Sequence, residues 1–392
     1  MTHSSQSAVV VGAGVFGLAA ALELRNRGWA VTLLDPGPLP RPHASSTDRS
    51  KVVRMDYGRD EALSRLAQRA VEGWERWNVE RFARPLFHRT GFLLLTLEPM
   101  AAGGFEMESF RSLAARGIPV ERVKPDLLAK RFPAWNPARF VDGYLSHQAG
   151  WAESGEVVRA MLAWCRREGV SLLHRHVERV VHTGGRVRGA ACAGGEMVTG
   201  DAVIVAAGAW TPGLVPELSH SLRPAAMPVL YFRPRHREPF LARRFPVWGA
   251  DIPRTGWYGF PVGPDGIVKL GHHGKGWTGD PEDPGAVPSG WEERARDFLA
   301  ESLPGLADAP LAGGRVCFYC DARDGDFWLT RHPAVQGLVV ASGGSGHGFK
   351  FAPVLGELVA NCVEGQDDPR LARFGWRPEA PPGAEHARYQ GD

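Results

Sequence analysis

The segment from Val9 to Asp35 restricts the possible fold of this chain more than any other stretch. It contains an apolar run, the pattern Gly12-x-Gly14-x-x-Gly17, an alanine- and leucine-rich run, and a second apolar run that ends in an acid. This order predicts a strand, a glycine turn, a helix and a second strand. The three glycines permit the tight turn, the approach of a pyrophosphate and the close packing of helix on strand.

In such a unit the diphosphate faces the free N–H groups at the helix N-terminus, and the terminal acid accepts hydrogen bonds from a ribose. The segment therefore predicts a dinucleotide site formed by Gly12, Gly14, Val15, Phe16, Gly17 and Asp35. An ordinary glycine-rich turn between a strand and a helix is the alternative. The segment leaves both NAD and FAD open as the dinucleotide.

A chain of 392 residues is long enough for two domains or for one large discontinuous domain. Its net charge is only +3 and it contains no basic tract, which argues against a nucleic-acid partner. No apolar run is long enough to span a bilayer, and the polar first residues do not resemble a signal peptide. We therefore expect a cytoplasmic protein that does not contact a membrane, with its five cysteines as free thiols.

Lysine is rare in this chain: only six of the 46 basic residues are lysines. Arginine could have supplied charge alone, so each lysine suggests a specific role. Lys51 lies in the polar stretch 41–56, which brings hydroxyls and cations close to the dinucleotide unit. Candidate cofactor contacts in that stretch are Ser46, Thr47, Ser50 and Lys51. A solvated loop is the alternative interpretation.

Two later segments repeat the pattern of a buried strand followed by small residues. Residues 201–205 form an apolar run that leads into Ala207, Gly208 and Trp210, and residues 337–342 lead into a glycine-rich loop and a helix that extends to about residue 361. The N–H groups of such a loop and the positive helix end would face an electron-rich group. The candidate contacts in this loop are Gly344, Ser345, Gly346, His347, Gly348 and Lys350.

A hairpin is predicted over residues 257–273. If Val262 pairs with Ile267, strand alternation places four side chains on one face. These are Tyr258, Phe260, Lys269 and His273. A lysine and a histidine among aromatic rings are typical of a pocket wall, whereas a solvent-exposed face would leave them without a role.

Cys317 and Cys320 form a CxxC pattern, which can indicate a redox pair or half of a zinc site. The segment reads as a strand, in which side chains three residues apart point to opposite faces. The chain contains no second CxxC. We therefore expect neither a redox pair nor a metal site.

These motifs together resemble the sarcosine oxidase branch of the D-amino-acid-oxidase-like flavoproteins, which includes N-methyl amino acid, pipecolate, saccharopine and fructosyl-amino-acid oxidases. The resemblance covers nearly the whole chain. It rests on Gly12-x-Gly14-x-x-Gly17, Arg54 before Asp56-Tyr57-Gly58, Ala206-Ala207-Gly208-Ala209-Trp210, Tyr258-Gly259-Phe260-Pro261, Lys269-Leu270-Gly271, Val316-Cys317-Phe318-Tyr319, and Ser345-Gly346-His347-Gly348-Phe349-Lys350-Phe351.

The resemblance implies an α/β fold in which a Rossmann-type FAD-binding domain is interleaved with a mainly antiparallel-sheet substrate domain. We place the first domain at 1–85, 145–225 and 312–392, and the second at 86–144 and 226–311. The resemblance further implies FAD attached covalently through Cys317. It also implies that Lys269 promotes flavin reoxidation by O2, a role that Lys51 could also fill.

For the substrate, the resemblance implies that Arg54 and Lys350 bind a carboxylate, and that Tyr258 and His273 form the pocket wall. The backbone at Val177 would contact adenine. The expected reaction oxidises the C–N bond of a secondary amine to an imine that hydrolyses, with O2 reduced to hydrogen peroxide. Small-molecule amine and O2 are then the only partners, and the branch is mostly monomeric.

The sequence departs from the sarcosine oxidases at several positions. Thr47 and Lys51 stand where those enzymes have a histidine and an arginine near the flavin, and Arg59 replaces an acid beside the pocket. A pocket methionine aligns near Gly249, which suggests a larger amine than sarcosine. A flavin dehydrogenase that passes electrons to a carrier, an NAD-dependent reductase and a non-catalytic flavin-binding or tRNA-modifying protein are the alternative functions.

Overall fold

The computed structural model describes residues 6–383, 388, 389 and 391. The polar residues 1–5, which contributed to the expectation of no signal peptide, lie outside this range. Among the described residues, no helix combines the length and the apolar character needed to cross a membrane.

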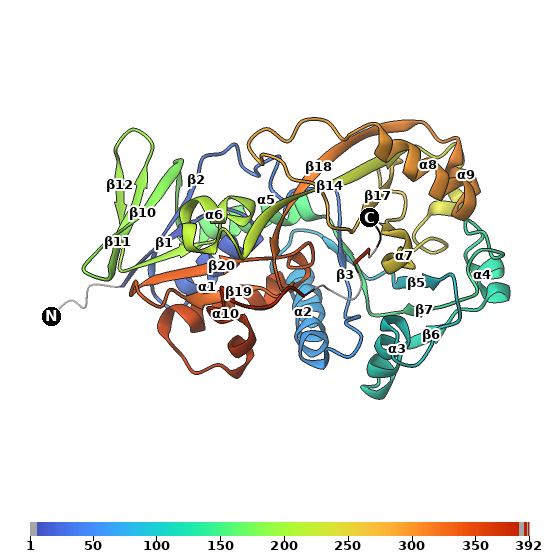
Figure 1. Ribbon diagram of the computed structural model, residues 1–392, viewed down its shortest axis with the longest axis horizontal. Helices are drawn as coiled ribbons and strands as arrows, with labels where there is room; N and C mark the ends of the chain where they lie inside the picture. Colours follow the sequence, from blue (N-terminus) through green and yellow to red (C-terminus); the bar gives the residue numbers. More distant parts are fainter. Residues whose placement is uncertain (1–5, 384–387, 390, 392) are drawn as a thin grey trace.

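A six-stranded sheet carries the predicted dinucleotide unit, on the left in Figure 1. Its strand order is β19-β20-β13-β1-β2-β9, and all neighbours are parallel except β19 and β20. The strands are β1 (Ser7–Val11), β2 (Ala30–Asp35), β9 (Ser171–His174), β13 (Ala202–Val205), β19 (Trp328–Arg331) and β20 (Leu338–Ser342).

This sheet is covered on both faces, which explains why its strands are almost continuously apolar. Ala8 and Val10 face the core that contains the helices, and Val9 and Val11 face a second core. The helices on the first face are α1 (Val15–Asn26), α5 (Ser154–Arg167) and α10 (Ala352–Glu364). The second face is covered by β10 (Val177–Thr183), β11 (Arg186–Cys192), β12 (Met197–Thr199), α6 (Thr211–Leu214) and η2 (Pro216–Leu218).

An eight-stranded sheet, on the right in Figure 1, has the order β18-β14-β17-β16-β15-β5-β7-β6. It is antiparallel except where β15 runs parallel to β5. Its strands are β5 (Phe92–Thr96), β6 (Val120–Arg122), β7 (Asp142–Ser146), β14 (Leu222–Phe232), β15 (Val247–Ala250), β16 (Trp257–Gly259), β17 (Val268–His272) and β18 (Leu311–Ala322).

The remaining elements connect or cover these sheets. A small sheet joins β3 (Lys51–Val53), β8 (Gly150–Ala152) and β4 (Phe87–His88). The other helices are α2 (Glu61–Glu80), α3 (Phe105–Ala115), α4 (Pro125–Arg131), α7 (Ile252–Thr255), α8 (Gly290–Ser302) and α9 (Pro304–Ala307). Short 3-10 turns are η1 (Gly208–Trp210), η3 (Glu238–Phe240), η4 (Phe349–Phe351) and η5 (Pro369–Phe374).

The mixed α/β fold with one largely parallel and one largely antiparallel sheet confirms the predicted fold class. The domain boundaries remain a prediction. The chain alternates between the two large sheets, which supports the interleaving of the two parts. After β1 and β2 of the six-stranded sheet it forms β5 and β7 of the eight-stranded sheet, and it then returns to the six-stranded sheet with β9 and β13. By hydrogen bonding, β18 belongs with the eight-stranded sheet although the predicted boundary assigns residues 312–322 to the FAD-binding part.

The carboxyl ends of β1, β13 and β20 meet at one edge of the six-stranded sheet, because these parallel strands are neighbours. The loop after β1 lies directly on the loop after β13. A Cβ atom at Gly12, whose φ is +106°, would come within 2.6 Å of the Ala206 carbonyl oxygen. Glycine is therefore required there by both its backbone angle and its close contact.

Candidate active site

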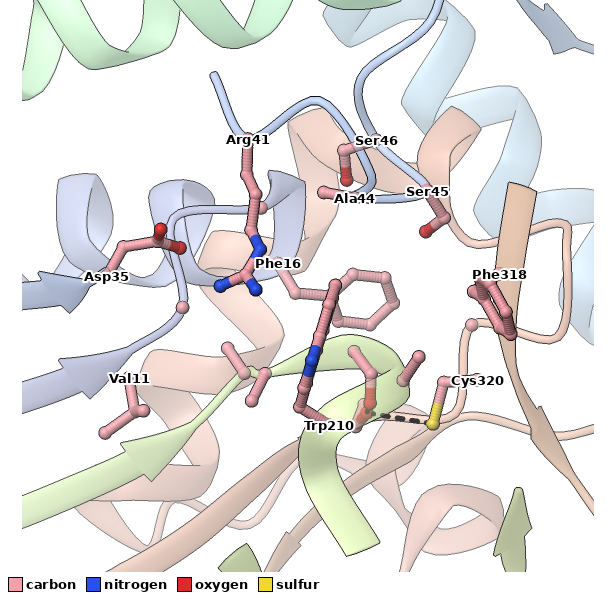
Figure 2. A pocket seen from close by; sticks show the side chains of 18 of the residues that line it. Val11, Phe16, Asp35, Arg41, Ala44, Ser45, Ser46, Trp210, Phe318 and Cys320 are labelled. Carbon is pink, nitrogen blue, oxygen red and sulfur yellow. Dashed lines mark hydrogen bonds between the residues drawn. The ribbon is translucent and has the colours of Figure 1, made fainter. Parts of the chain in front are cut away.

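A cavity of about 300 Å³ opens at this edge of the six-stranded sheet (Figure 2). It is lined by fourteen of the residues that the sequence assigned to the cofactor: Gly12, Gly14, Val15, Phe16, Asp35, Ser46, Lys51, Val177, Ala207, Gly208, Trp210, Gly344, Gly346 and Gly348. These residues come from loops and strands that are distant in the sequence. Their convergence on one cavity is a property of the tertiary structure.

The Asp35 carboxylate is fixed in the lining of this cavity. It accepts hydrogen bonds from the N–H of Ala13 at 2.9 Å and from the N–H of Gly37 at 3.0 Å. At the start of α1, the N–H of Val15 donates to the Ser46 hydroxyl at 3.1 Å. The acid and the helix N-terminus therefore both line the cavity, which agrees with the expected ribose and diphosphate contacts.

The glycines of the cavity wall fit a bulky dinucleotide. A Cβ atom at Gly14 would meet only the Ser46 hydroxyl, at 3.4 Å, and one at Gly208 would meet nothing within 4 Å. The wall is therefore bare backbone at these points. Gly17 has a different role, since its Cβ would lie 1.9 Å from the Gly12 carbonyl oxygen, so it permits the packing of α1 on the turn.

An arginine that the sequence analysis did not select lies over the cofactor cavity. The Arg41 guanidinium stacks on the Trp210 ring at 4.3 Å and forms an ion pair with Glu282 at 2.6 Å. All three residues line the cavity, and Figure 2 shows Arg41 and Trp210 projecting into it. The spacing of these residues in the sequence gives no signal of this contact.

A second cavity, of about 60 Å³, contains the predicted substrate residues Lys51, Arg54, Tyr258, His273 and Lys350. The rest of its lining is Val52, Phe92, Ile252, Tyr319, Gly346, His347 and Phe349. The two cavities share Lys51, Tyr319, Gly346 and Phe349 as lining residues, so they adjoin.

Arg54 and Lys350 are held rigidly at this second cavity. Arg54 is 7% exposed, lies against the rings of Tyr57 and Phe92, and donates to the Asp56 carbonyl. The Lys350 ammonium donates to the Tyr57 hydroxyl at 3.0 Å and to the His347 carbonyl at 2.9 Å. Two buried cations thus meet at one small cavity.

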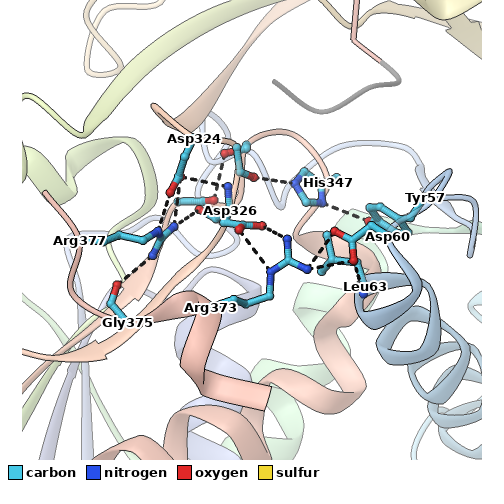
Figure 3. Close-up of polar contacts among 12 residues, drawn as sticks. Tyr57, Asp60, Leu63, Asp324, Asp326, His347, Arg373, Gly375 and Arg377 are labelled. Atoms are coloured by element: carbon cyan, nitrogen blue, oxygen red, sulfur yellow. Dashed lines mark hydrogen bonds and ion pairs between the residues drawn. The ribbon is translucent and has the colours of Figure 1, made fainter. Parts of the chain in front are cut away.

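His347 supports Lys350 rather than lining the cofactor cavity. Its Nδ1 is hydrogen-bonded to the Tyr57 hydroxyl at 3.1 Å, and its Nε2 to the Gly325 carbonyl, also at 3.1 Å. The turn that contains Gly325 is tied to other elements by ion pairs, including Arg373 with Asp326 at 2.6 Å (Figure 3). The sequence analysis did not identify Tyr57, although it stands within a quoted motif.

The predicted hairpin face is confirmed. Tyr258 pairs with Gly271, and the N–H of Phe260 donates to the carbonyl of Lys269. The Lys269 ammonium lies 4.5 Å from the centre of the Phe260 ring, and Lys269 is 2% exposed. The alternative of a solvent-exposed face is therefore wrong.

Lys269 and Lys51 both contact the carboxylate of Asp48, a residue that the sequence analysis did not select. The Asp48 Oδ2 atom lies 2.6 Å from the Lys269 ammonium and 3.4 Å from the Lys51 ammonium. Lys269 also donates to the Ser50 carbonyl at 2.5 Å. The only sequence signal for Asp48 was its place among the polar residues of the stretch 41–56.

The charges of this group are strongly coupled. Burial opposes the charge of Asp48, yet Lys269, Lys51 and Arg315 hold the pKa of its carboxyl well below the ordinary value. Burial lowers the pKa of Lys269 to about 8, against the opposing effect of Asp48. Burial also opposes the charge of Lys51, but Cys317 and Asp48 raise its pKa.

The two cysteines of the CxxC pattern point into different surroundings, as strand alternation predicted. Cys317 packs among Met227, Val229 and other residues of the β14–β18 region, with its sulfur 3.7 Å from the Lys51 ammonium. Cys320 lines the cofactor cavity, and burial raises the pKa of its thiol to about 11. Neither forms a disulfide.

Several predicted site residues lie outside the lining of both cavities. Ser345 turns its hydroxyl away, to accept from the N–H of Ala322 at 3.0 Å. Thr47 contributes its carbonyl to Arg315. The other predicted residues outside both linings are Gly17, Ser50, Lys269 and Cys317.

Gly249, which suggested a larger amine than sarcosine, does not itself open extra room in the cavity. A Cβ atom there would come within 2.8 Å of the Ile252 side chain and 3.2 Å of the Phe92 ring. Both of these side chains line the second cavity, so they fill the space that a smaller residue at 249 leaves. Arg59 is exposed at the surface and pairs with Glu108 at 3.6 Å.

A glycine-walled dinucleotide cavity that adjoins a small cavity with two buried cations is typical of an oxidoreductase that binds a dinucleotide cofactor beside its substrate. The chain belongs to the family of FAD-dependent oxidoreductases, whose family model matches residues 7–362. Its cofactor is therefore FAD, and the protein is an enzyme.

Named relatives agree with this assignment. The chain is 29% identical to monomeric sarcosine oxidase of Bacillus sp. (strain B-0618) over 362 residues, which is 91% of each chain. It is 28% identical to N-methyl-L-tryptophan oxidase of Salmonella agona (strain SL483), covering 93% of this chain and 98% of the relative. The solved structure of fructosyl amine: oxygen oxidoreductase (Amadoriase I) from Aspergillus fumigatus superimposes with a TM-score of 0.82 at 26% identity, covering 97% of this chain and 91% of that chain.

Proposed function

We propose that this enzyme oxidises the C–N bond of a small secondary amino acid to an imine, which then hydrolyses, and that it reduces O2 to hydrogen peroxide. The observation that carries the proposal is the small cavity beside the cofactor cavity, which the cations of Arg54 and Lys350 line together with aromatic and aliphatic side chains. The relatives named above, a sarcosine oxidase and an N-methyl-L-tryptophan oxidase, support a secondary amine as the substrate.

Arg54 binds the substrate carboxylate, since its planar guanidinium can hold both oxygens and so fix the plane of the group. Lys350 adds a second charge-assisted hydrogen bond. Hydrogen bonds to the Tyr57 hydroxyl and the His347 carbonyl fix the position of its ammonium group at the cavity. This fixed anchor positions the amine beside the shared wall of the two cavities, and such positioning supplies much of the rate.

The cations and the apolar side chains of the lining together favour the neutral amine, which is the form that can be oxidised. Phe92, Ile252 and Phe349 line the cavity, and desolvation disfavours an ammonium. Among the residues that the structure describes, the cavity lining contains no Asp or Glu that could pair with a substrate cation. Bound FAD supplies the two-electron acceptor, and the chain's own residues bind the substrate, orient it and exclude water.

Lys269 supplies positive charge where O2 becomes negatively charged during its reduction, as a compact ammonium can do. Lys51 is the other candidate for this role. Both ammonium groups lie within 3.4 Å of the same Asp48 oxygen. We also infer that Cys317 carries the FAD covalently and that the enzyme is a monomer, as the name of the sarcosine oxidase relative suggests.

The substrate class follows from the lining. A cavity of about 60 Å³ with Phe92 and Ile252 filling the region over Gly249 suits a small N-alkyl or cyclic imino acid with an apolar substituent. The small volume of this cavity also disfavours a bulky sugar substituent.

A peroxide-coupled screen tests the proposal. The panel contains sarcosine, N-methylalanine, L-proline, L-pipecolate and fructosyl glycine, with D-amino acids as controls. We expect peroxide from one of the small apolar secondary amines and the lowest kcat/KM for fructosyl glycine. Oxidation of these amines only in the presence of an artificial electron acceptor would instead identify a dehydrogenase.

A further inference from the structure

The Asp48 carboxylate occupies the centre of a buried cluster of ionisable groups. Its side chain is fully buried. Four elements contribute charged or titratable groups around it: Lys51 from β3, Lys269 from β17, Tyr231 from β14, and Arg315 and Cys317 from β18. Tyr258 of β16 faces Lys51 in the same cluster. Asp48 is the only carboxylate that interacts with both lysines among the described residues.

The carboxylate is fixed in place by contacts that do not involve the lysines. Its Oδ1 atom accepts from the Tyr231 hydroxyl at 2.9 Å and from the N–H of Arg49 at 2.7 Å. The Asp48 carbonyl accepts from the N–H of Gly155 and from the Ser154 hydroxyl at the start of α5. The other oxygen, Oδ2, is thereby directed at the two ammonium groups.

We propose that Asp48 is a positioning residue that holds Lys269 in its charged form and fixes its distance from Lys51, so that positive charge is available for the reaction with O2. This inference rests on the function proposed above. A buried lysine without a nearby anion releases its proton readily. Asp48 opposes this release, and the single carboxylate also limits the repulsion between the two ammonium groups.

The direct test is the titration of Lys269 in the intact flavoenzyme. Because the chain contains only six lysines, biosynthetic labelling with ¹³Cε-lysine gives a small set of NMR signals. The Lys269 signal can be assigned from its loss in Lys269→Met. Asp48→Asn should lower the midpoint of Lys269 by about 1 to 3 pH units, the usual effect of one adjacent charge. A midpoint within half a unit of wild type, in a variant with full flavin content, overturns the proposal.

A matched control is available elsewhere in the chain. Asp142 is also buried and pairs with a lysine, Lys124, at 3.0 Å. Asp142→Asn should leave the Lys269 midpoint unchanged. A shift of Lys269 in this control as large as in Asp48→Asn would show a general effect of losing a buried carboxylate and would overturn the specific role.

The kinetic readout has a signature that misfolding does not produce. At pH 7.5, flavin reoxidation by O2 in Asp48→Asn should be about 10-fold slower than in wild type, and the deficit should shrink as the pH falls and Lys269 regains its proton. Asp48→Glu should recover most of the rate because it restores the charge. A deficit that is constant with pH overturns the proposal.

Lys51→Met keeps the proposal testable if Asp48→Asn does not fold. This variant removes the Lys51 ammonium, which repels the charge of Lys269, so the titration midpoint of Lys269 should move upward. An unchanged midpoint would show that the two lysines are not coupled through Asp48 and would overturn the proposal. The NMR titration does not depend on turnover. A failure of the proposed amine oxidation therefore shows itself in the peroxide assay alone, whereas a failure of the Asp48 inference shows itself in the lysine titration.

Discussion

Arg54→Met is expected to abolish most of the preference for carboxylated amines. The Arg54 side chain is 7% exposed and packed against aromatic rings, so water cannot easily replace its hydrogen bonds. Truncation of one partner in a buried charge pair costs about 2–5 kcal/mol. Because Lys350 keeps one positive charge at the cavity, we expect the lower part of this range, about 2–3 kcal/mol, or roughly a 30- to 160-fold loss in kcat/KM.

The assay compares the best amino acid of the panel with its decarboxylated counterpart, for example L-proline with pyrrolidine, by initial rates of peroxide formation. The loss in Arg54→Met should be confined to the carboxylated compound. Arg54→Lys retains the charge without the planar fork and should lose about 10-fold. Flavin absorbance and the melting temperature control for folding. An equal loss with both compounds would refute the assignment, because it would mean that Arg54 does not act on the carboxylate.

Three further predictions concern the cofactor and its reoxidation. Lys269→Met should slow reoxidation by O2 far more than reduction by substrate in stopped-flow experiments, and wild-type reoxidation should fall as the pH rises through about 8, where Lys269 loses its proton. Equal slowing of both half-reactions would contradict this. After acid precipitation, the yellow colour should stay with the wild-type pellet but leave with the supernatant in Cys317→Ser; free flavin from wild type would disprove the covalent link. In that Cys317→Ser background, Arg41→Gln should weaken FAD affinity about 2- to 5-fold, because the stacking of Arg41 on Trp210 is lost. The affinity is measured by flavin fluorescence. An unchanged affinity would show that this contact does not retain the cofactor.

Local patterns were sufficient to predict the dinucleotide unit. The glycine spacing, the helix and Asp35 lie within one continuous segment, and their arrangement depends on backbone geometry that nearby residues determine. The hairpin face was also predictable. Strand alternation fixes which side chains share a face once a single pair, here Tyr258 with Gly271, is in register.

Packing between distant segments decided the parts of the site that local patterns did not reveal. The room expected near Gly249 is filled by Ile252 and Phe92, since a neighbouring side chain can occupy the space that a small residue leaves. Similarly, Arg41 reaches Trp210 and Glu282 only through the folding of loops from separate parts of the chain.

The sequence alone determined the Rossmann-type unit, the cofactor class that its combined motifs resemble, and the presence of a few lysines in unusual places. Only the tertiary structure decided how these lysines are used. Asp48 and Lys269 are 221 residues apart, and Lys51 and Cys317 are 266 residues apart. No periodicity links such positions. Their contacts and their charges depend on how the two sheets and the intervening loops pack, because burial and proximity set the charge state of each group.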